Sequence, residues 1–231
     1  MRPEEFVSQD ARFRYTRGVF TARTLSEGKW SIGLLAVLAI ATILWCPVRW
    51  APVLPLALLA FTISFFRDPE RQVPAAPKLI VAPADGRVVE IKSVNEPHFL
   101  KGEATMVAIF LSVFDGHVQR APIDGQIKFV QYHEGRFLDA RNPQATLVNE
   151  NRVVGIESAD GFRVTVRQIA GLIARRIVGW ADTGAKLVKG ERLGMIRFGS
   201  RVELFLPRDT EITVKIGDQA KGGETIVARR K

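Results

Sequence analysis

The sequence predicts a mainly β protein, an antiparallel barrel or sandwich, preceded by an N-terminal α-helical membrane hairpin. Three observations support this fold class: an almost uncharged apolar run near the N-terminus, short β-rich segments over the rest of the chain, and a glycine pattern that occurs twice. The 231 residues are enough for one sizeable domain and an appendage. The single cysteine excludes a disulfide framework and any zinc site that needs two thiolates from one chain.

The first two predicted parts are a basic N-terminal arm, residues 1–29, and a membrane-anchoring hairpin, residues 30–66. The only charged residue among the 37 positions of the hairpin is Arg49, close to the helix breaker Pro47. The run therefore divides into apolar halves of 17 and 16 residues. At about 1.5 Å per residue, each half would be roughly 25 Å long, near the lower limit for crossing a bilayer. Because the halves are this short, a buried soluble hairpin stays open as an alternative.

Basic residues flank the apolar run on both sides. They are Arg12, Arg14, Arg17, Arg23 and Lys29 before it, and Arg67, Arg71 and Lys78 after it. Since positive charge is retained on the cytoplasmic side, both ends of the hairpin would be cytoplasmic and Arg49 would lie at the far turn. A monotopic hairpin that dips into one leaflet would give the same pattern.

The net charge of +9 fits either a nucleic acid or an anionic membrane surface. Residues 67–231 carry +6 of this charge, but they contain no basic block with interleaved aromatic residues and no helix-turn-helix, RNP or zinc-finger pattern. We therefore expect an anionic lipid surface as partner and no nucleic acid. The three histidines form no i,i+4 pair of ligands, so no metal site is expected.

Residues 67–231 form the predicted β-rich domain, in which runs of β-favouring residues alternate with Gly, Pro, Asp and Asn. The expected strands are 87–93, 105–113, 126–132, 152–157, 163–169, 201–206 and 211–216. Only residues 169–178 could form a short helix, and Gly171 weakens that prediction.

The repeated glycine pattern lies near the C-terminus. Gly184 and Gly190, the second followed by Glu, recur 33 positions later as Gly217 and Gly223. Glycines at this spacing are typical of a tight turn that enters a strand. The pattern resembles the turns of lipoyl- and biotinyl-like barrels.

Two dipeptides could hold chemistry as well as structure. Asp85-Gly86, before a β run, is by default a hairpin turn. Gly199-Ser200, between two apolar alternating runs, is by default a two-residue type II′ turn. A tight turn can also hold strain and expose a peptide carbonyl to the hydroxyl that follows it. The residues permit that reaction without predicting it.

Two histidines are candidate catalytic groups, although a lone histidine is more often a packed or surface residue. His117 shares a short segment with Asp115 and Arg120, and both could set its protonation state. His133, which precedes Glu134, is the weaker candidate. Directly after the apolar run, the arginines at 67 and 71 either contact lipid head groups or belong to a solvated linker.

In this order, the segments resemble the short-form phosphatidylserine decarboxylases, the pyruvoyl-dependent lyases of bacterial phospholipid synthesis. The resemblance runs from about residue 65 to the end and includes the apolar hairpin before it. It implies that the chain cleaves itself between Gly199 and Ser200. Ser200 Oγ attacks the Gly199 carbonyl, and β-elimination with hydrolysis turns residue 200 into an N-terminal pyruvoyl group. The products would be a β chain, 1–199, and an α chain, 200–231.

The resemblance also implies the reaction and the partners. The pyruvoyl group, a covalent cofactor derived from Ser200, would bind the substrate's serine amine as a Schiff base and act as electron sink for the loss of CO2. Phosphatidylserine in an anionic membrane would thus become phosphatidylethanolamine. The α and β chains would form a heterodimer, with a higher oligomer left open. The expected location is the bacterial cytoplasmic membrane, with the catalytic domain on the cytoplasmic face.

Residue roles carry over only where the motifs match. Long forms of the family use Asp, His and Ser as a self-cleavage triad, with an H-x-x-H pair in the middle segment. Asp85 matches the Asp and His117 the first histidine, but Arg120 occupies the place of the second, which is the base in the long forms. Either His117 takes both roles or His133 supplies the base, and we favour His117. The candidate head-group ligands are Arg67, Arg71 and Arg120.

Two alternatives stay open at this point. The first is a related decarboxylase of another serine lipid, such as archaetidylserine, because these motifs do not encode head-group specificity. The second is a membrane-anchored lipoyl-like module that acts as a non-enzymatic adaptor. It would use the same paired glycine turns, although neither turn presents a carrier-type lysine flanked by Met or Asp.

Overall fold

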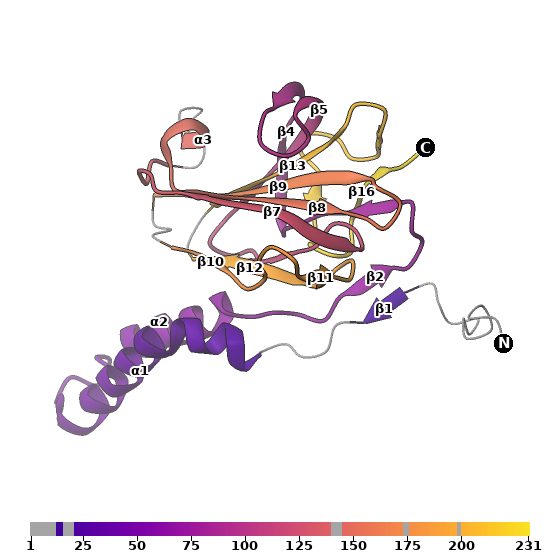
Figure 1. Cartoon of the computed structure of the whole chain (residues 1–231). Helices are drawn as coiled ribbons and strands as arrows, with labels where there is room; N and C mark the ends of the chain where they lie inside the picture. The colour runs from indigo at the N-terminus through magenta and orange to yellow at the C-terminus, as the bar shows by residue number, and fades with distance from the viewer. Residues whose placement is uncertain (1–12, 16–20, 140–144, 173–175, 198–199) are drawn as a thin grey trace. The chain divides into compact units, whose positions relative to one another are not determined.

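The computed structural model describes residues 13–15, 21–139, 145–172, 176–197 and 200–231 (Figure 1). The chain forms two compact units. One is helical and lies within residues 17–70; the other is β-rich and contains β1 (Phe13–Tyr15) together with the described residues from Arg71 onward.

The helical unit consists of α1 (Ala22–Trp45) and α2 (Val53–Phe65). α1 begins eight residues before the predicted run because a capping box fixes its start: Thr21 Oγ1 accepts from the Thr24 amide at 3.2 Å, and Thr24 Oγ1 accepts from the Thr21 amide. Of the described helices, α1 alone is long and apolar enough to cross a membrane. The 13 residues of α2 span only about 20 Å.

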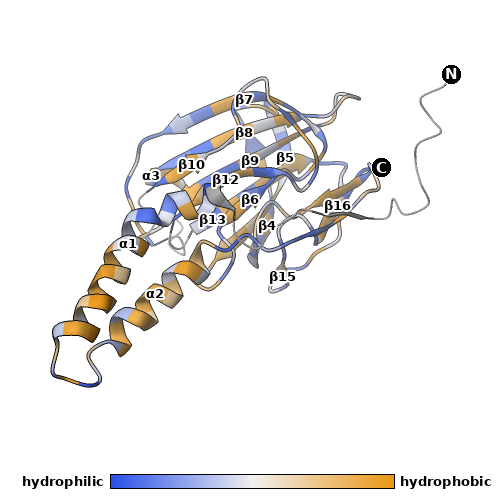
Figure 2. Cartoon of the chain, turned by 90° about the horizontal axis from the view of Figure 1, so that it is seen from below, coloured by the Kyte–Doolittle hydropathy of each residue, from blue (hydrophilic) through white to orange (hydrophobic). Residues whose placement is uncertain are grey.

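Apolar residues predominate in both helices, apart from the more hydrophilic start of α1 (Figure 2). The exposed ones include Trp30, Leu34, Leu44, Trp45, Trp50 and Leu54. An apolar surface of this extent is typical of a segment that contacts lipid or another protein. The predicted α-helical hairpin is confirmed, with a longer first helix and a shorter second one than the sequence indicates.

An eight-stranded antiparallel sheet dominates the β-rich unit. Its order is β11 (Lys186–Leu187), β7 (Gly125–His133), β8 (Asn151–Glu157), β9 (Arg163–Ala170), β13 (Ser200–Pro207), β5 (Gly102–Leu111), β4 (Gly86–Glu96) and β15 (Gln219–Ala220). One three-stranded sheet contains β10 (Ile177–Gly179), β12 (Arg192–Ile196) and β6 (Val118–Arg120). Another contains β14 (Glu211–Ile212), β16 (Ile226–Arg229) and β3 (Leu79–Val81). β2 (Gln72–Pro74) pairs with β1, and α3 (Ala145–Val148) is a single helical turn.

These strands confirm the mainly β antiparallel fold, and each of the seven predicted strands overlaps an observed one. The suggested helix over 169–178 is wrong, because its described ends lie in β9 and β10. α3 was not predicted. The core lies between one face of the large sheet and the two small sheets, where Val202 and Leu204 pack with Ile80 and Leu193.

The large sheet repeats itself about its centre, between β9 and β13. The two predicted glycine turns are confirmed and occupy equivalent places: Gly190 donates to Ala121 O and Gly223 donates to Ala82 O, both at 2.8 Å. All four glycines of the pattern have positive φ, which a side chain would strain. The equivalence extends to two carboxylates, because Asp85 accepts from the Gly222 amide at 2.7 Å and Asp124 accepts from the Lys189 amide at 3.0 Å.

Candidate active site

Ser200 is the first residue of β13 and lies at the centre of the large sheet. It pairs with Leu111 of β5 on one side and with Ala170 of β9 on the other. Its side chain is fully buried, and its Oγ has no hydrogen-bond partner among the described residues. Leaving a buried hydroxyl unpaired costs about 1–3 kcal/mol and is rare in native proteins, so it points to a functional role.

The segment before Ser200 is not the type II′ hairpin that the sequence indicates by default. β12 ends at Ile196 in a small sheet, whereas β13 begins at Ser200 in the large one, so the chain passes from one sheet to the other. Gly199 lies outside the described residues.

His117 lies beside this crossing. Its carbonyl accepts from the Ile196 amide at 3.3 Å, and it follows the loop that leaves Leu111, the pairing partner of Ser200. The imidazole is fully buried, and its Nδ1 is 2.9 Å from the Asp115 carbonyl oxygen. Because a carbonyl only accepts, Nδ1 carries the proton, and Nε2 is the basic nitrogen of the neutral ring.

Asp85 lies against the residue that precedes His117. A Cβ on Gly116 would be only 2.4 Å from Asp85 Oδ2, so this contact requires glycine. The carboxylate accepts from Arg71 Nη2 at 2.6 Å as well as from the Gly222 amide. The default hairpin turn at Asp85-Gly86 is wrong, since β3 and β4 belong to different sheets.

The three arginines expected at lipid head groups differ in burial and in hydrogen-bond partners. Arg120 is 1% exposed and donates to Gly190 O at 2.9 Å, beneath the glycine turns. Arg71 is engaged by Asp85. Arg67 belongs to the helical unit, is partly exposed, and donates to the Ser64 carbonyl at 2.9 Å.

His133 lies at the end of β7, on the other side of the sheet from the Ser200 side chain. It pairs with Asn151, Asn151 pairs with Ile169, and Ile169 pairs with Arg201. Paired residues of an antiparallel sheet project to the same face, and neighbours along a strand to opposite faces. His133 therefore shares a face with Arg201, and its ring centre is 5.8 Å from that of His98.

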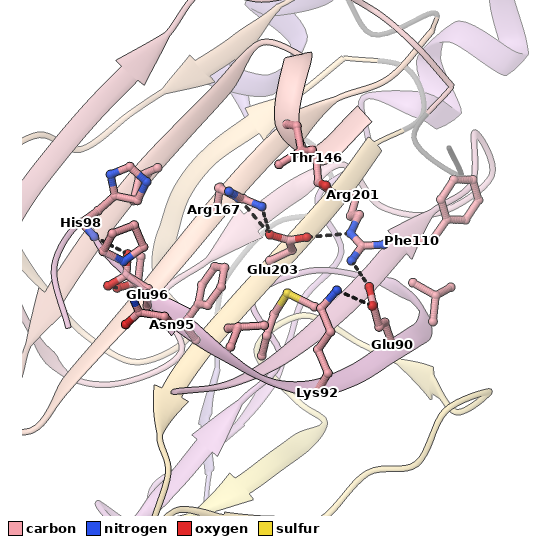
Figure 3. A pocket seen from close by; sticks show the side chains of 18 residues that line it. Glu90, Lys92, Asn95, Glu96, His98, Phe110, Thr146, Arg167, Arg201 and Glu203 are labelled. Atoms are coloured by element: carbon pink, nitrogen blue, oxygen red, sulfur yellow. Dashed lines mark hydrogen bonds and ion pairs between the residues drawn. The ribbon is translucent and has the colours of Figure 1, made fainter. Parts of the chain in front are cut away.

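The opposite face of the sheet carries a charged network that was not predicted from the sequence. Arg167, Glu203, Arg201, Glu90 and Lys92 form consecutive ion pairs along a cavity of about 730 Å³ (Figure 3). The signal was present as charges at alternate positions of β13, between the apolar residues of the core face. Burial alone would raise the pKa of Glu90, but hydrogen bonds from Lys92 and Arg201 bring it below its ordinary value, so this carboxylate is charged at neutral pH.

Comparison with known proteins identifies the family. The model of the family described as phosphatidylserine decarboxylase matches residues 58–228. The chain belongs to this family. Its match begins within α2 and covers the segments that hold Asp85, His117 and Ser200.

Curated relatives in the phosphatidylserine decarboxylase family agree with this assignment. The phosphatidylserine decarboxylase proenzyme of Symbiobacterium thermophilum is 45% identical over 204 residues, which are 88% of this chain and 94% of the relative. The proenzyme of the same name from Carboxydothermus hydrogenoformans is 44% identical over 207 residues, 89% of this chain and 95% of the relative. The proenzyme of Geobacter metallireducens is 47% identical over 171 residues, which are 74% of this chain and 78% of the relative.

Proposed function

We propose that this chain is a phosphatidylserine decarboxylase proenzyme that cleaves itself between Gly199 and Ser200. The processed enzyme then converts phosphatidylserine into phosphatidylethanolamine and CO2. One observation carries the proposal: in a chain of this family, a buried hydroxyl at Ser200, without a hydrogen-bond partner among the described residues, begins a central strand. Its pairing partner Leu111 leads into the loop in which Gly116, against Asp85, precedes His117.

Self-cleavage follows from the groups at the site. Ser200 Oγ attacks the Gly199 carbonyl carbon while His117 Nε2 takes the hydroxyl proton and returns it to the departing nitrogen, which turns the amide into an ester. Loss of the Ser200 α-proton and breakage of the Cβ–Oγ bond then free Gly199 as a carboxylate. Hydrolysis of the dehydrated residue 200 releases ammonia and leaves the pyruvoyl group.

The site fits that group. Its three carbon atoms would be those of Ser200, its keto oxygen would come from the water that displaces ammonia, and it would stay at the start of a strand that is paired on both sides. Once formed, a pyruvoyl carbonyl supplies an electron sink for an amine substrate. The residues of this chain would bury and orient it, and we assign the proton transfer at the reacting centre to His117, whose buried ring is oriented by the Asp115 carbonyl.

We favour His117 over His133 as the processing base because His133 lies on the opposite face of the sheet. For Asp85 we infer an orienting role next to His117. The Arg71 ion pair and the Gly222 amide hold its carboxylate in place. These contacts support a role for Arg71 at the cleavage site in place of the head-group role expected from the sequence.

Asp124 provides a matched control for Asp85, because it makes the equivalent bond to a glycine turn in the other half of the sheet. Asp85→Asn is expected to slow self-cleavage by about a hundredfold or more, the usual scale for disturbing acid–base catalysis. Asp124→Asn loses a similar structural bond and should cleave within about threefold of the unmodified rate. The measurement is the time course of α-chain appearance by gel electrophoresis. Equal slowing in both variants would reduce Asp85 to a structural residue.

The helical unit supports membrane attachment. Its exposed apolar surface and the basic residues near both of its ends suit an anionic bilayer. We propose that it holds the enzyme at the cytoplasmic face of the bacterial inner membrane, where the substrate stays in its leaflet. α2 is too short to cross a bilayer as a straight helix, which favours a hairpin that enters one leaflet.

Intact mass under denaturing conditions tests the proposed function. Freshly purified protein should contain two chains divided before residue 200, of which the smaller has 32 residues and a blocked N-terminus. An active preparation that consists of a single 25.7 kDa chain would overturn the proposal. A non-enzymatic adaptor would also stay whole, whereas a decarboxylase of another serine lipid would be cleaved and would differ in its preferred head-group lipid.

A further inference from the structure

The network on the face opposite the Ser200 side chain is centred on Arg201, the second residue of the proposed α chain. Arg201 Nε donates to Glu203 Oε1 at 2.8 Å, and its Nη2 pairs with Glu90 (Figure 3). The other oxygen of Glu203 accepts from Arg167 Nε, also at 2.8 Å. The Arg201 side chain is 11% exposed and that of Glu203 only 1%, so the ion pair between them is largely shielded from water and salt, whereas Arg167 at 21% and Glu90 at 33% are more accessible.

Two of these ion pairs cross the proposed chain boundary. Arg201 and Glu203 belong to residues 200–231, whereas Glu90 lies on β4 and Arg167 on β9. After cleavage, the pairs Arg201–Glu90 and Arg167–Glu203 would therefore join separate chains, on both sides of β13.

We propose that Arg201 is a positioning residue, whose clamp by Glu90 and Glu203 holds the start of the α chain in register after cleavage. The proposal rests on the proposed self-cleavage. While the chain is whole, residue 200 is tethered on both sides; once the bond is broken it becomes a chain end, and chain ends fray. Fixing Arg201 on one face fixes the residue before it on the other, because neighbours along a strand alternate.

Arg208, the first residue after the opposite end of β13, serves as a control. It pairs with Glu103 and therefore also joins the proposed α and β chains, but the two side chains are 67% and 70% exposed. Exposed pairs contribute little, and this one lies far along β13 from residue 200. Arg208→Gln removes an inter-chain ion pair without touching the clamp.

Hydrogen exchange measured by mass spectrometry tests the proposed clamp independently of the decarboxylase activity. In processed Arg201→Gln, the amides of residues 201–203 should exchange at least about tenfold faster than in the unmodified enzyme, as expected for a fraying strand end. Processed Arg208→Gln should show no change there. In the uncleaved Ser200→Ala background, Arg201→Gln should have a much smaller effect, since the chain remains continuous.

Kinetics of the processed variants give the second readout. Arg201→Gln should lower kcat about tenfold or more with a small change in KM, because a displaced reacting group affects the chemical step more than lipid binding. Glu90→Gln, which leaves Glu203 paired, should give a smaller change in the same direction. Cleaved Arg201→Gln with unchanged exchange and kcat would overturn the clamp and leave the proposed function standing.

The two proposals fail in different ways. If the unmodified protein is never cleaved before residue 200, the proposed function fails and the clamp with it. If the unmodified protein is cleaved but neither Arg201→Gln nor Glu90→Gln is, the network acts before cleavage, and the clamp proposal is wrong.

Discussion

Replacing Ser200 with alanine is expected to leave one uncleaved chain that releases no CO2 from phosphatidylserine. Alanine lacks the hydroxyl that attacks the Gly199 carbonyl, and without cleavage no pyruvoyl group forms. Both activities should fall below detection, since the reaction loses its nucleophile and its electron sink together. The measurements are intact mass and CO2 release from labelled phosphatidylserine.

Misfolding is a poor explanation for such a loss. Ser200 Oγ is buried without a hydrogen-bond partner among the described residues, so its removal takes away a desolvated polar atom and only a small volume. The variant should unfold at the same temperature as the uncleaved wild-type chain, or up to a few degrees higher. CO2 release by a Ser200→Ala chain of full length would refute the assignment of the pyruvoyl precursor.

Replacing His117 with glutamine is expected to slow self-cleavage by about a hundredfold or more, within the range for loss of a general base. Glutamine has a similar volume and retains a donor for the Asp115 carbonyl, but it cannot accept the Ser200 proton at neutral pH. The half-time of α-chain formation is the readout. Added imidazole should restore part of the rate, which a merely structural role would not predict.

His133→Gln is the matched control for this experiment. This variant carries the same substitution on the opposite face of the sheet, and it should cleave itself at nearly the rate of the unmodified protein. The reverse pattern, with only the His133 variant uncleaved, would transfer the role of base to His133. It would also mean that the sheet rearranges around residue 200 before it reacts.

Strands and glycine turns were the features that the sequence predicted best. Alternation along 201–206 matches β13, and the repeated glycine spacing predicts two turns whose glycines all have positive φ. These signals are local, because each depends on neighbours within a few positions of the chain. The start of α1 was missed, since a capping box of two threonines outweighs the charged residues in the first turns.

Site geometry depended on strand register, which is not a local property. A bulge between Ile127 and Phe129 changes the pairing along β7, so the face that His133 occupies could not be counted from the sequence alone. The partner of Asp85 was equally hidden, because Arg71 and Gly222 are distant from it in the chain. Motifs therefore indicated the candidate residues, and strand register decides which of them share a face of the sheet.

The two halves of the large sheet repeat one another, but the candidate site occupies only one of them. Asp124 is the counterpart of Asp85, but Lys78 takes the place of His117, and Phe162, preceded by Gly161, takes the place of Ser200. The other half retains the architecture without the proposed nucleophile or the proposed base. The proposed site is thus built on a scaffold that occurs twice, and two side chains, His117 and Ser200, distinguish the half that holds it.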